Sequence, residues 1–253
     1  MVRPRAVADV LHGVPVGHPA HPALAQAALG SLVSAGILDL VPGPRVSSRL
    51  LILAGMGFAA PAIVTGYADW AELHEQQQRV GIVHSSTNVV ALALYGGSLL
   101  TTGVRSRVLA FAGLGAITVS GFLGGHMSYR QSAGANHTED VPHLVRPGWQ
   151  DLCALDDLGA EGVPTRRVLE GDVPVLVVRD RGAVRVLAER CSHLSGPLSE
   201  GSIADGCVTC PWHGSVFDLA DGAVVHGPAT APQPAFETRV VAGRLEVQLP
   251  GAG

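Results

Sequence analysis

Two short cysteine–histidine motifs in the C-terminal half place the strongest constraint on this chain. The first is Cys191-Ser192-His193 and the second is Cys210-Pro211-Trp212-His213. Two thiols and two imidazoles on two loops form a complete ligand set for a metal centre, and one zinc ion is the simplest occupant. Zinc sites, however, usually pair ligands of like type within each segment. One Cys and one His from each loop instead suit two unequal iron atoms, one bound by both Cys and the other by both His.

The residues around these motifs add to the iron interpretation. They include His193-Leu194, Gly196-Pro197-Leu198, Gly201 and the run CPWHGSVFD at 210–218. In these residues the chain resembles the Rieske [2Fe-2S] family, over about residues 148–250. The resemblance implies an all-β sandwich with both ligand loops at one tip. It also implies a [2Fe-2S] cluster held by Cys191, His193, Cys210 and His213, with a surrounding shell that includes Leu194, Trp212, Ser215, Phe217 and Pro228.

The sequence departs from the high-potential branch of that family. Respiratory members carry a second Cys in each ligand loop, joined as a disulfide, whereas this chain has Gly196 and Trp212 there. Those members also direct a Ser and a Tyr hydroxyl to cluster sulfurs; Ser215 is retained, but Phe217 stands at the Tyr position. Hydrogen bonds to sulfur raise the potential. We therefore expect a ferredoxin-type cluster with a potential below that of the respiratory proteins.

The segment after residue 147 has the pattern of a small antiparallel β domain. Short β-type runs such as 173–179 and 184–188 alternate with turn pairs such as Gly171-Asp172 and Asp221-Gly222. Residues 131–146 are polar and contain Gly and Pro, which is typical of a linker. The sequence therefore predicts a linker at 131–146 and a Rieske domain at 147–250.

The first half of the chain has a different character. Hydrophobic residues make up 47% of the sequence and charged residues only 15%, and the apolar excess lies before residue 130. Runs without charge, each long enough to cross a bilayer, cover residues 22–38, 50–68, 80–104 and 108–128. Short joints make consecutive helices antiparallel neighbours. The predicted fold class is thus α + β multidomain: a tail at 1–21, a four-helix transmembrane bundle at 22–130, then the all-β Rieske sandwich.

This half also resembles a family of bacterial four-helix membrane domains of unknown function, over about residues 15–135. The matching pieces are His18-Pro19 with His21-Pro22, Gly66-Tyr67-Ala68-Asp69-Trp70, and the run GGHMSYR at 124–130. The resemblance supports the helical architecture and implies no activity.

Three histidines of the predicted bundle are candidates for function. Antiparallel spans place His21, His84 and His126 on the same side of the membrane, and an ionisable residue in a span is a functional hypothesis by default. His84 and His126 are candidate axial ligands of a b-type haem, with His21 or His74 as alternatives. The other interpretations are proton-handling groups or hydrogen-bonding residues at the membrane interface, with His84 and Asn88 sharing one helix face.

These features predict a membrane-anchored carrier of single electrons. Its partner would be another redox protein, a membrane quinol, or a haem in its own bundle. The alternatives are a quinol-oxidising subunit and a redox sensor. A terminal oxygenase is not expected, since that activity needs a further iron site, and the net charge of −4 argues against nucleic acid. We expect a multi-pass membrane protein; no twin-arginine leader is recognised, which favours a cytoplasmic Rieske domain.

Overall fold

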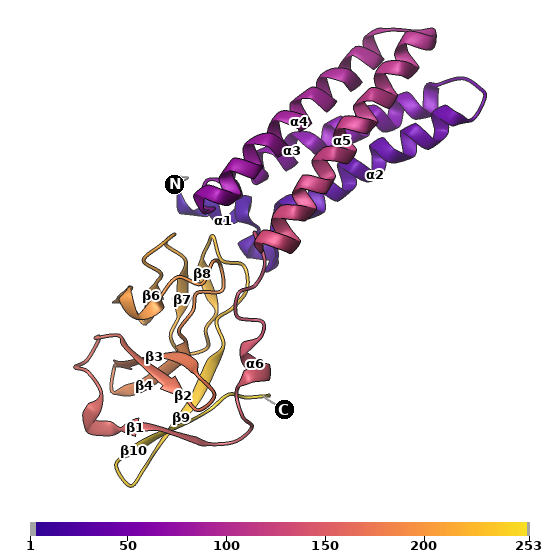
Figure 1. The fold of residues 1–253 in the computed structure, drawn as a ribbon. Coiled ribbons are helices and arrows are strands. Elements are labelled where there is room, and N and C mark those ends of the chain that lie inside the picture. The colour runs from indigo at the N-terminus through magenta and orange to yellow at the C-terminus, as the bar shows by residue number, and fades with distance from the viewer. Residues whose placement is uncertain (1–3, 252–253) are drawn as a thin grey trace. The chain divides into compact units, whose positions relative to one another are not determined.

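The computed structural model describes residues 4–251, and these residues form two compact units (Figure 1). Residues 19–134 form a helical unit. Residues 4–18 pack together with residues 135–251 in a second unit, which contains all the described strands. The predicted order, a helical part followed by a β-sheet part, is confirmed.

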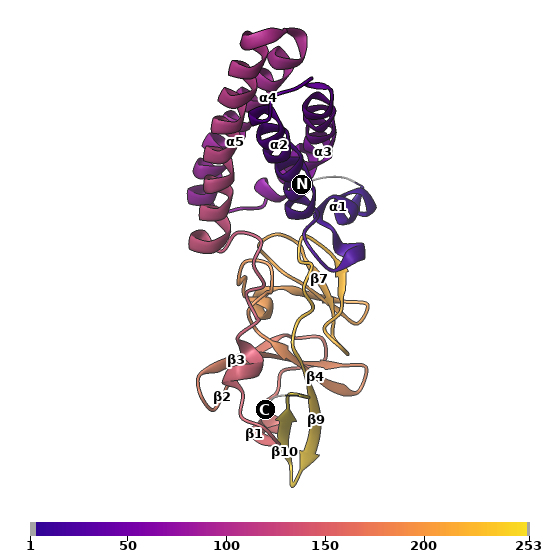
Figure 2. The same cartoon turned by 90° about the vertical axis from the view of Figure 1, so that its right-hand side faces the viewer.

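Four long helices build the helical unit: α2 (Ala20–Leu40), α3 (Val46–Trp70), α4 (Glu75–Leu100) and α5 (Gly103–Gln131). Helix α2 packs along α3, and α4 packs along α5, while smaller contacts join α2 to α5 and α3 to α4 (Figure 2). Helices α2 and α4 therefore lie at opposite corners of the unit. Its interior is made largely of small residues, and at Gly55 an added Cβ would lie 2.7 Å from Leu32 Cγ.

Three of the described helices, α2, α3 and α5, are long and apolar enough to cross a membrane. Helix α4 is not among them, although the sequence predicted a span at residues 80–104. Polar residues occupy much of its first half, in the runs EQQQR at 75–79 and HSSTN at 84–88. Length and composition thus support three of the four predicted spans.

The break between α4 and α5 lies before Arg105–Arg107, the joint implied by the predicted runs at 80–104 and 108–128. Helix α4 ends at Leu100, and Thr101 and Thr102 are both extended, with φ of −117° and −134°. Gly103 follows with φ of +60°, in the region that favours glycine. The Arg49 guanidinium donates to the carbonyls of Leu99 and Thr101, and a cation suits the C-terminal end of α4. Both predicted joint arginines therefore lie in the first turns of α5.

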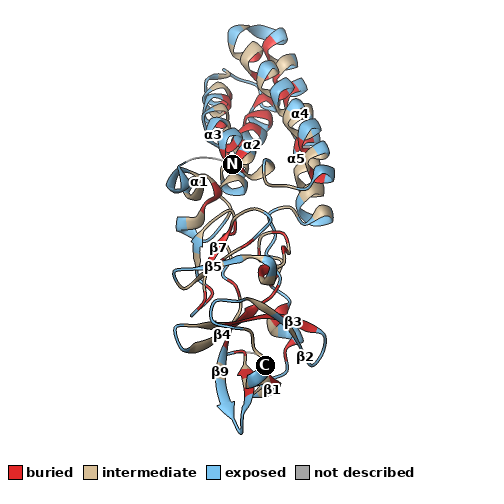
Figure 3. Cartoon of the chain, turned by 90° about the vertical axis from the view of Figure 1, so that its left-hand side faces the viewer, coloured by how far each residue is buried: buried red, intermediate tan, exposed pale blue. Residues whose placement is uncertain are grey.

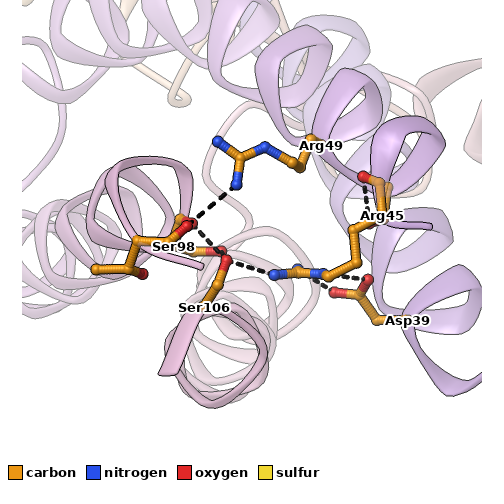
Figure 4. Close-up of polar contacts among 7 residues, drawn as sticks. Asp39, Arg45, Arg49, Ser98 and Ser106 are labelled. Atoms are coloured by element: carbon orange, nitrogen blue, oxygen red, sulfur yellow. Dashed lines mark hydrogen bonds and ion pairs between the residues drawn. The ribbon is translucent and has the colours of Figure 1, made fainter. Parts of the chain in front are cut away.

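A buried ion pair at this end of the unit is hydrogen-bonded across the boundary between the two helix hairpins (Figure 4). The Asp39 side chain is 1% exposed and accepts hydrogen bonds from Arg45 to both carboxylate oxygens, one of them at 2.7 Å from Nε. Arg45 also donates to Ser106, whose hydroxyl donates to the carbonyl of Ser98 at 2.6 Å. Asp39 and Arg45 flank the α2–α3 turn, while the two serines lie on α4 and α5. The network therefore fixes one hairpin against the other.

Two antiparallel sheets form the body of the second unit (Figures 1 and 2). The larger has the order β1-β10-β9-β4-β3-β2 and consists of β1 (Gln150–Ala154), β10 (Arg244–Gln248), β9 (Ala235–Val241), β4 (Ala183–Ala188), β3 (Val173–Asp180) and β2 (Thr165–Leu169). The smaller has the order β5-β6-β7-β8 and consists of β5 (Ser202–Ala204), β6 (Cys207–Thr209), β7 (Val216–Asp218) and β8 (Val224–His226). Short helices complete the unit: α1 (Arg5–His12), η1 (Val14–Val16), α6 (Val141–Leu144), η2 (Leu155–Asp157) and η3 (Leu198–Glu200).

Two apolar cores lie in this unit because β3 and β4 turn alternate residues to opposite faces. Val175, Val177 and Val186 point into the first core, and Leu176 and Leu187 into the second. The second core also contains the two motif cysteines.

The predicted linker is partly built into the first core. Val141, the first residue of α6, and Val145, which follows the helix, are 8% and 5% exposed and pack there. The polar composition of residues 131–146 concealed these two apolar anchors. The helical unit gives way to the β unit at residue 134, inside the stretch predicted as linker.

Candidate iron–sulfur centre

Two similar turns carry the cysteine–histidine motifs, one after β4 and one between β6 and β7. In the first, the N–H of Cys191 donates to Gly196 O and the N–H of Ser195 donates to Cys191 O, both at 2.8 Å. In the second, the N–H of Cys210 donates to Ser215 O at 2.8 Å and that of Gly214 donates to Cys210 O at 3.2 Å. Each Cys therefore closes its own turn, with the His two or three positions further along it.

The two cysteines lie side by side in the second apolar core. Cys191 is 1% and Cys210 is 2% exposed, and their sulfur atoms are hydrogen-bonded. The hydrogen bond from Cys191 lowers the pKa of the Cys210 thiol to about 7, and the N–H groups of Trp212 and His213 add to this effect. The same contact and burial raise the pKa of Cys191. One proton is thus lost readily and the second is retained, unless a bound cation replaces it.

The two motif histidines form a second pair. Their ring centroids are 5.0 Å apart and the ring planes are nearly perpendicular, at 88°. With metal–nitrogen bonds of about 2.0–2.1 Å, two imidazoles on one tetrahedral metal ion would have ring centres about 5 Å apart. The separation of His193 and His213 fits such an ion.

The donor set is arranged as two pairs. Among residues 4–251, no three His, Cys, Asp or Glu side chains converge on a point where one metal ion would sit. A single tetrahedral zinc site would require such a convergence. Two pairs, one of thiols and one of imidazoles, fit two metal atoms with different ligands.

Glycine at position 196 provides the close approach between the loops. An added Cβ there would lie 2.8 Å from the Cys210 sulfur and 3.2 Å from atoms of the Trp212 ring. Gly196 and Trp212, which stand where the respiratory proteins have their disulfide cysteines, are thus in contact, with the indole packed over the glycine. All four cysteines are free in the structure.

Ser215 connects the turn at residues 227–229 to the cysteines. Its side chain is fully buried, and its Oγ accepts the N–H of Ala229 at 3.0 Å. Its hydroxyl also hydrogen-bonds to Cys191, which opposes the rise in the pKa of that thiol caused by Cys210 and burial. Pro228 lies within this turn, next to Ala229. Phe217 is fully buried in the same core as both cysteines, and Leu194 is 4% exposed in the first loop.

Three polar residues that position these loops were missed by sequence reasoning. Gln233, 1% exposed, accepts the N–H of Ser192 at 3.1 Å and donates to the carbonyls of Ala188 and Arg190. Glu189 accepts hydrogen bonds from the N–H and hydroxyl of Ser199. The third is Asp9. Each is a single polar residue with no motif around it, so no local pattern could have identified it.

Asp9 of α1 holds the end of β8 and the turn that follows. Its carboxylate accepts the Nδ1–H of His226 at 2.8 Å and the N–H of Gly227 at 2.9 Å. An added Cβ at Gly227 would lie 2.8 Å from a methyl carbon of Val14, so η1 packs closely here as well. The predicted N-terminal tail is therefore attached to the turn that contains Pro228.

The three candidate histidines of the helical unit do not gather at one place. His21 and His84 lie together, with ring centroids 6.5 Å apart. His126 instead lines a pocket of about 310 Å³ with His74, Gln77 and Arg130. Ser120 and Gly124 of α5 face the His84 ring, and two residues beyond Gly124 the direction around the helix differs by about 200°. The predicted pairing of His84 with His126 is therefore not observed.

Comparison with known proteins agrees with the geometry of the loops. Residues 148–237 match the family model of the Rieske [2Fe-2S] domain. The ferredoxin subunit of anthranilate 1,2-dioxygenase from Burkholderia cepacia is 37% identical over 101 residues, which cover 40% of this chain and 92% of that protein. Ferredoxin CarAc from Metapseudomonas resinovorans is 30% identical over 99 residues, covering 39% of this chain and 92% of that protein.

A longer relative and a solved structure were also found. Apoptosis-inducing factor 3 from Homo sapiens is 32% identical over 120 residues, which span only 19% of that protein. The ferredoxin of carbazole 1,9a-dioxygenase from Nocardioides aromaticivorans IC177 is 31% identical, with a TM-score of 0.37, and the match covers 39% of this chain and 95% of that one.

The loops and the matches together define an iron–sulfur protein. The chain belongs to the Rieske [2Fe-2S] family through its β unit, and its relatives include ferredoxin-type electron carriers. Membership implies a [2Fe-2S] cluster as cofactor.

Proposed function

We propose that this chain is a membrane-anchored carrier of single electrons. In this proposal Cys191 and Cys210 hold one iron of the cluster, and His193 and His213 hold the other. The observation that carries it is the separation of the donors into a buried thiol pair and an imidazole pair with ring centroids 5.0 Å apart. The cluster would supply the one-electron chemistry.

The protein side chains would control how electrons reach and leave this centre. The cysteines are buried, whereas the histidines are partly exposed and Trp212, beside His213, is 49% exposed. The imidazole edge is thus the more accessible side, where a partner would approach most closely. Ser215 and the backbone N–H groups of His193, Trp212 and His213 donate to the cysteine sulfurs, and such bonds stabilise the more negative, reduced cluster.

The proposed membrane anchor is supported by the burial of residues in the helical unit, where many small residues are buried and many large apolar residues are exposed. Its buried positions include Ala28, Ala62, Ala91 and Ser120, whereas larger apolar residues are exposed (Figure 3). Exposed examples are Ile37 (60%), Leu50 (61%), Val89 (62%) and Phe122 (75%). Apolar surface of this extent is unfavourable in water, but large side chains facing lipid and small ones between helices are typical of membrane proteins. We propose that α4 spans with its neighbours, its polar residues being covered by them in part.

The relatives suggest the kind of partner. Two of them are named as ferredoxins, one as the ferredoxin subunit of a dioxygenase. We infer that the partner of this chain is a redox protein that exchanges one electron with the cluster. The alternative partner is a membrane quinol, and the experiment must distinguish it from a redox protein.

The test is spectroscopic and uses the full-length protein in detergent. We expect two irons and two sulfides per chain and, on reduction, an EPR signal with the low average g-value of mixed His and Cys ligation. His213→Cys should change or abolish the signal, whereas His143→Cys, at an exposed position of the same unit, should leave it intact. Stoichiometric zinc without iron would contradict the ligand assignment.

The partner and the membrane location need separate measurements. The protein should be recovered with membranes and require detergent for extraction, and recovery in the aqueous fraction would refute the anchor. Reduction of the cluster by a soluble ferredoxin reductase, with no reduction by a quinol, would support the protein partner. Rapid reduction of the cluster by quinol alone would contradict the protein partner and support a quinol-oxidising subunit.

A further inference from the structure

The histidine pair inside the helical unit carries an inference beyond the iron–sulfur function. His21 is in the first turn of α2 and His84 is on α4, at opposite corners of the unit. Their rings nevertheless approach to 6.5 Å between centroids, with planes 87° apart. They approach each other through the interior that the four helices surround.

Each ring is held by a backbone carbonyl of a neighbouring helix. His21 Nδ1 lies 2.8 Å from the carbonyl oxygen of Ala62 on α3, and His84 Nδ1 lies 2.9 Å from that of Ser120 on α5. A carbonyl oxygen only accepts, so in both rings Nδ1 carries the proton. The Nε2 atoms therefore hold the lone pairs. Metal-binding histidines are commonly oriented by this kind of bond from the other ring nitrogen.

Glycines give the rings their space. An added Cβ at Gly66 would lie 2.8 Å from Nδ1 and 2.9 Å from Cε1 of His21, and one at Gly124 would lie 3.4 Å from Cε1 of His84. In both rings the edge containing Nδ1 and Cε1 is thus packed against a helix. The opposite edge, from Nε2 to Cδ2, is turned away from that helix.

The separation of the rings fits two ligands on opposite sides of one metal atom. With metal–nitrogen bonds of about 2.0–2.1 Å, trans imidazoles have ring centres about 6.4 Å apart. The cluster histidines, at 5.0 Å, have the shorter spacing expected of two ligands on a tetrahedral ion. The centroid distance of His21 and His84 therefore fits trans ligands, and that of His193 and His213 fits tetrahedral ligands.

The number of protein side chains available to bind a metal indicates which kind of cofactor fits between His21 and His84. No third His, Cys, Asp or Glu joins His21 and His84 in the part of the chain that the structure describes. A bare metal ion needs more protein ligands than two. An iron porphyrin brings four nitrogen donors of its own and leaves two axial positions, and such cofactors bind between facing helices.

We propose that His21 and His84 are the axial ligands of a haem in the helical unit. Asn88 Nδ2 lies 3.2 Å from His84 Nε2 in the structure and donates to its lone pair, so this amide would rotate away when iron binds. None of the hydrogen bonds found in residues 4–251 involves His21 Nε2. The haem would be a second one-electron group in the same chain.

The proposal is tested by titrating haemin into the full-length protein in detergent and recording the oxidised and reduced absorption spectra. We expect saturation at one haem per chain with a six-coordinate, low-spin spectrum. His21→Ala and His84→Ala should each weaken binding at least tenfold and abolish the low-spin spectrum. Added imidazole should restore it in His84→Gly. His126→Ala is the matched control, a histidine of the same unit outside the pair, and should bind like the unmodified protein.

Three results would overturn the proposal. One is unsaturable or absent haem binding by unmodified protein that elutes as a single species. Another is a low-spin spectrum that remains in each of the single variants His21→Ala and His84→Ala. The third is loss of binding in Asn88→Leu, because removing the competing amide should leave the affinity unchanged or higher. The EPR signal of the cluster, recorded on the same samples, tests the proposed electron carrier independently, so the two proposals fail separately.

Discussion

At the scale of single residues, Phe217 is the position through which the potential of the cluster can be tested. It is fully buried in the core that contains both cysteines, so a hydroxyl introduced there would have little water to bind and would seek a sulfur acceptor. A net hydrogen bond is worth about 0.5–1.5 kcal/mol. For a one-electron couple, this corresponds to about 20–65 mV.

We therefore predict that Phe217→Tyr raises the midpoint potential by about 20–65 mV, measured by redox titration of the EPR signal. Phe236→Tyr is the matched control, because Phe236 is buried in the other core of the same unit and its variant should keep the original midpoint. An unchanged midpoint in Phe217→Tyr, with the cluster intact, would show that the hydroxyl does not reach sulfur.

The residue scale also shows what sequence motifs can reveal. Cys191, His193, Cys210 and His213 were found from type and spacing, because ligand chemistry restricts which residues can serve. Gln233 and Glu189 were not found, because a buried hydrogen bond needs only a polar group in the right place. Many residue types meet that need, so such positions carry no distinctive sequence pattern.

At the scale of elements, the ion pair between Asp39 and Arg45 lies in the α2–α3 hairpin, and the hydrogen bond from Arg45 to Ser106 connects it to the α4–α5 hairpin (Figure 4). Removing one partner of a buried pair leaves an uncompensated charge and costs about 3–5 kcal/mol. We predict that Asp39→Ala destabilises the helical unit by about this amount, measured by thermal or denaturant unfolding in detergent.

Two further variants make this prediction specific. The double variant Asp39→Ala/Arg45→Met should recover much of the loss, because no buried charge then remains unpaired. Glu75→Ala breaks an ion pair whose side chains are 78% and 74% exposed, and it should have a far smaller effect because water screens that pair. Equal losses in Asp39→Ala and Glu75→Ala would contradict the role of the buried network.

A second prediction at this scale concerns the attachment of α1. Asp9 accepts hydrogen bonds from His226 and Gly227, and asparagine can replace only one of the two acceptor oxygens. Leaving a donor unsatisfied costs about 1–3 kcal/mol. We predict that Asp9→Asn destabilises the β unit by this amount and makes residues 5–17 more susceptible to limited proteolysis.

The control for this variant is Asp156→Asn, on η2 of the same unit, away from α1. It should leave the proteolysis pattern unchanged. If Asp9→Asn also leaves it unchanged, the carboxylate does not hold the N-terminal segment.

At the scale of the whole molecule, the division into two units predicts two separate responses to loss of the cluster. Metal binding stabilises the fold that presents its ligands, and these ligands lie only in the β unit. Removing the cluster from the full-length protein with a chelator and a reductant should lower the unfolding temperature of the β unit and leave that of the helical unit unchanged. Calorimetry or circular dichroism in detergent would resolve the two transitions, and a shift of both would show that the units unfold together.

Features that depend on local chemistry and composition could be predicted from the sequence. The order of ligands identified the cluster family, and the uncharged runs predicted the long helices, because a metal centre and an apolar environment both restrict residue types along the chain. The sequence could not locate the joint at Thr101–Thr102, where the conformation of three residues ends one helix and begins the next.

Contacts between residues far apart in the chain became known only from the folded structure. It joined Asp9 to the turn at residues 227–229, placed Val141 and Val145 of the predicted linker in a core, and paired His21 with His84 while leaving His126 elsewhere. Each of these contacts depends on the rotation of a helix or the path of a loop. A change of one or two residues in helical phase turns a side chain to another face, so only the packed structure could show which histidines face each other.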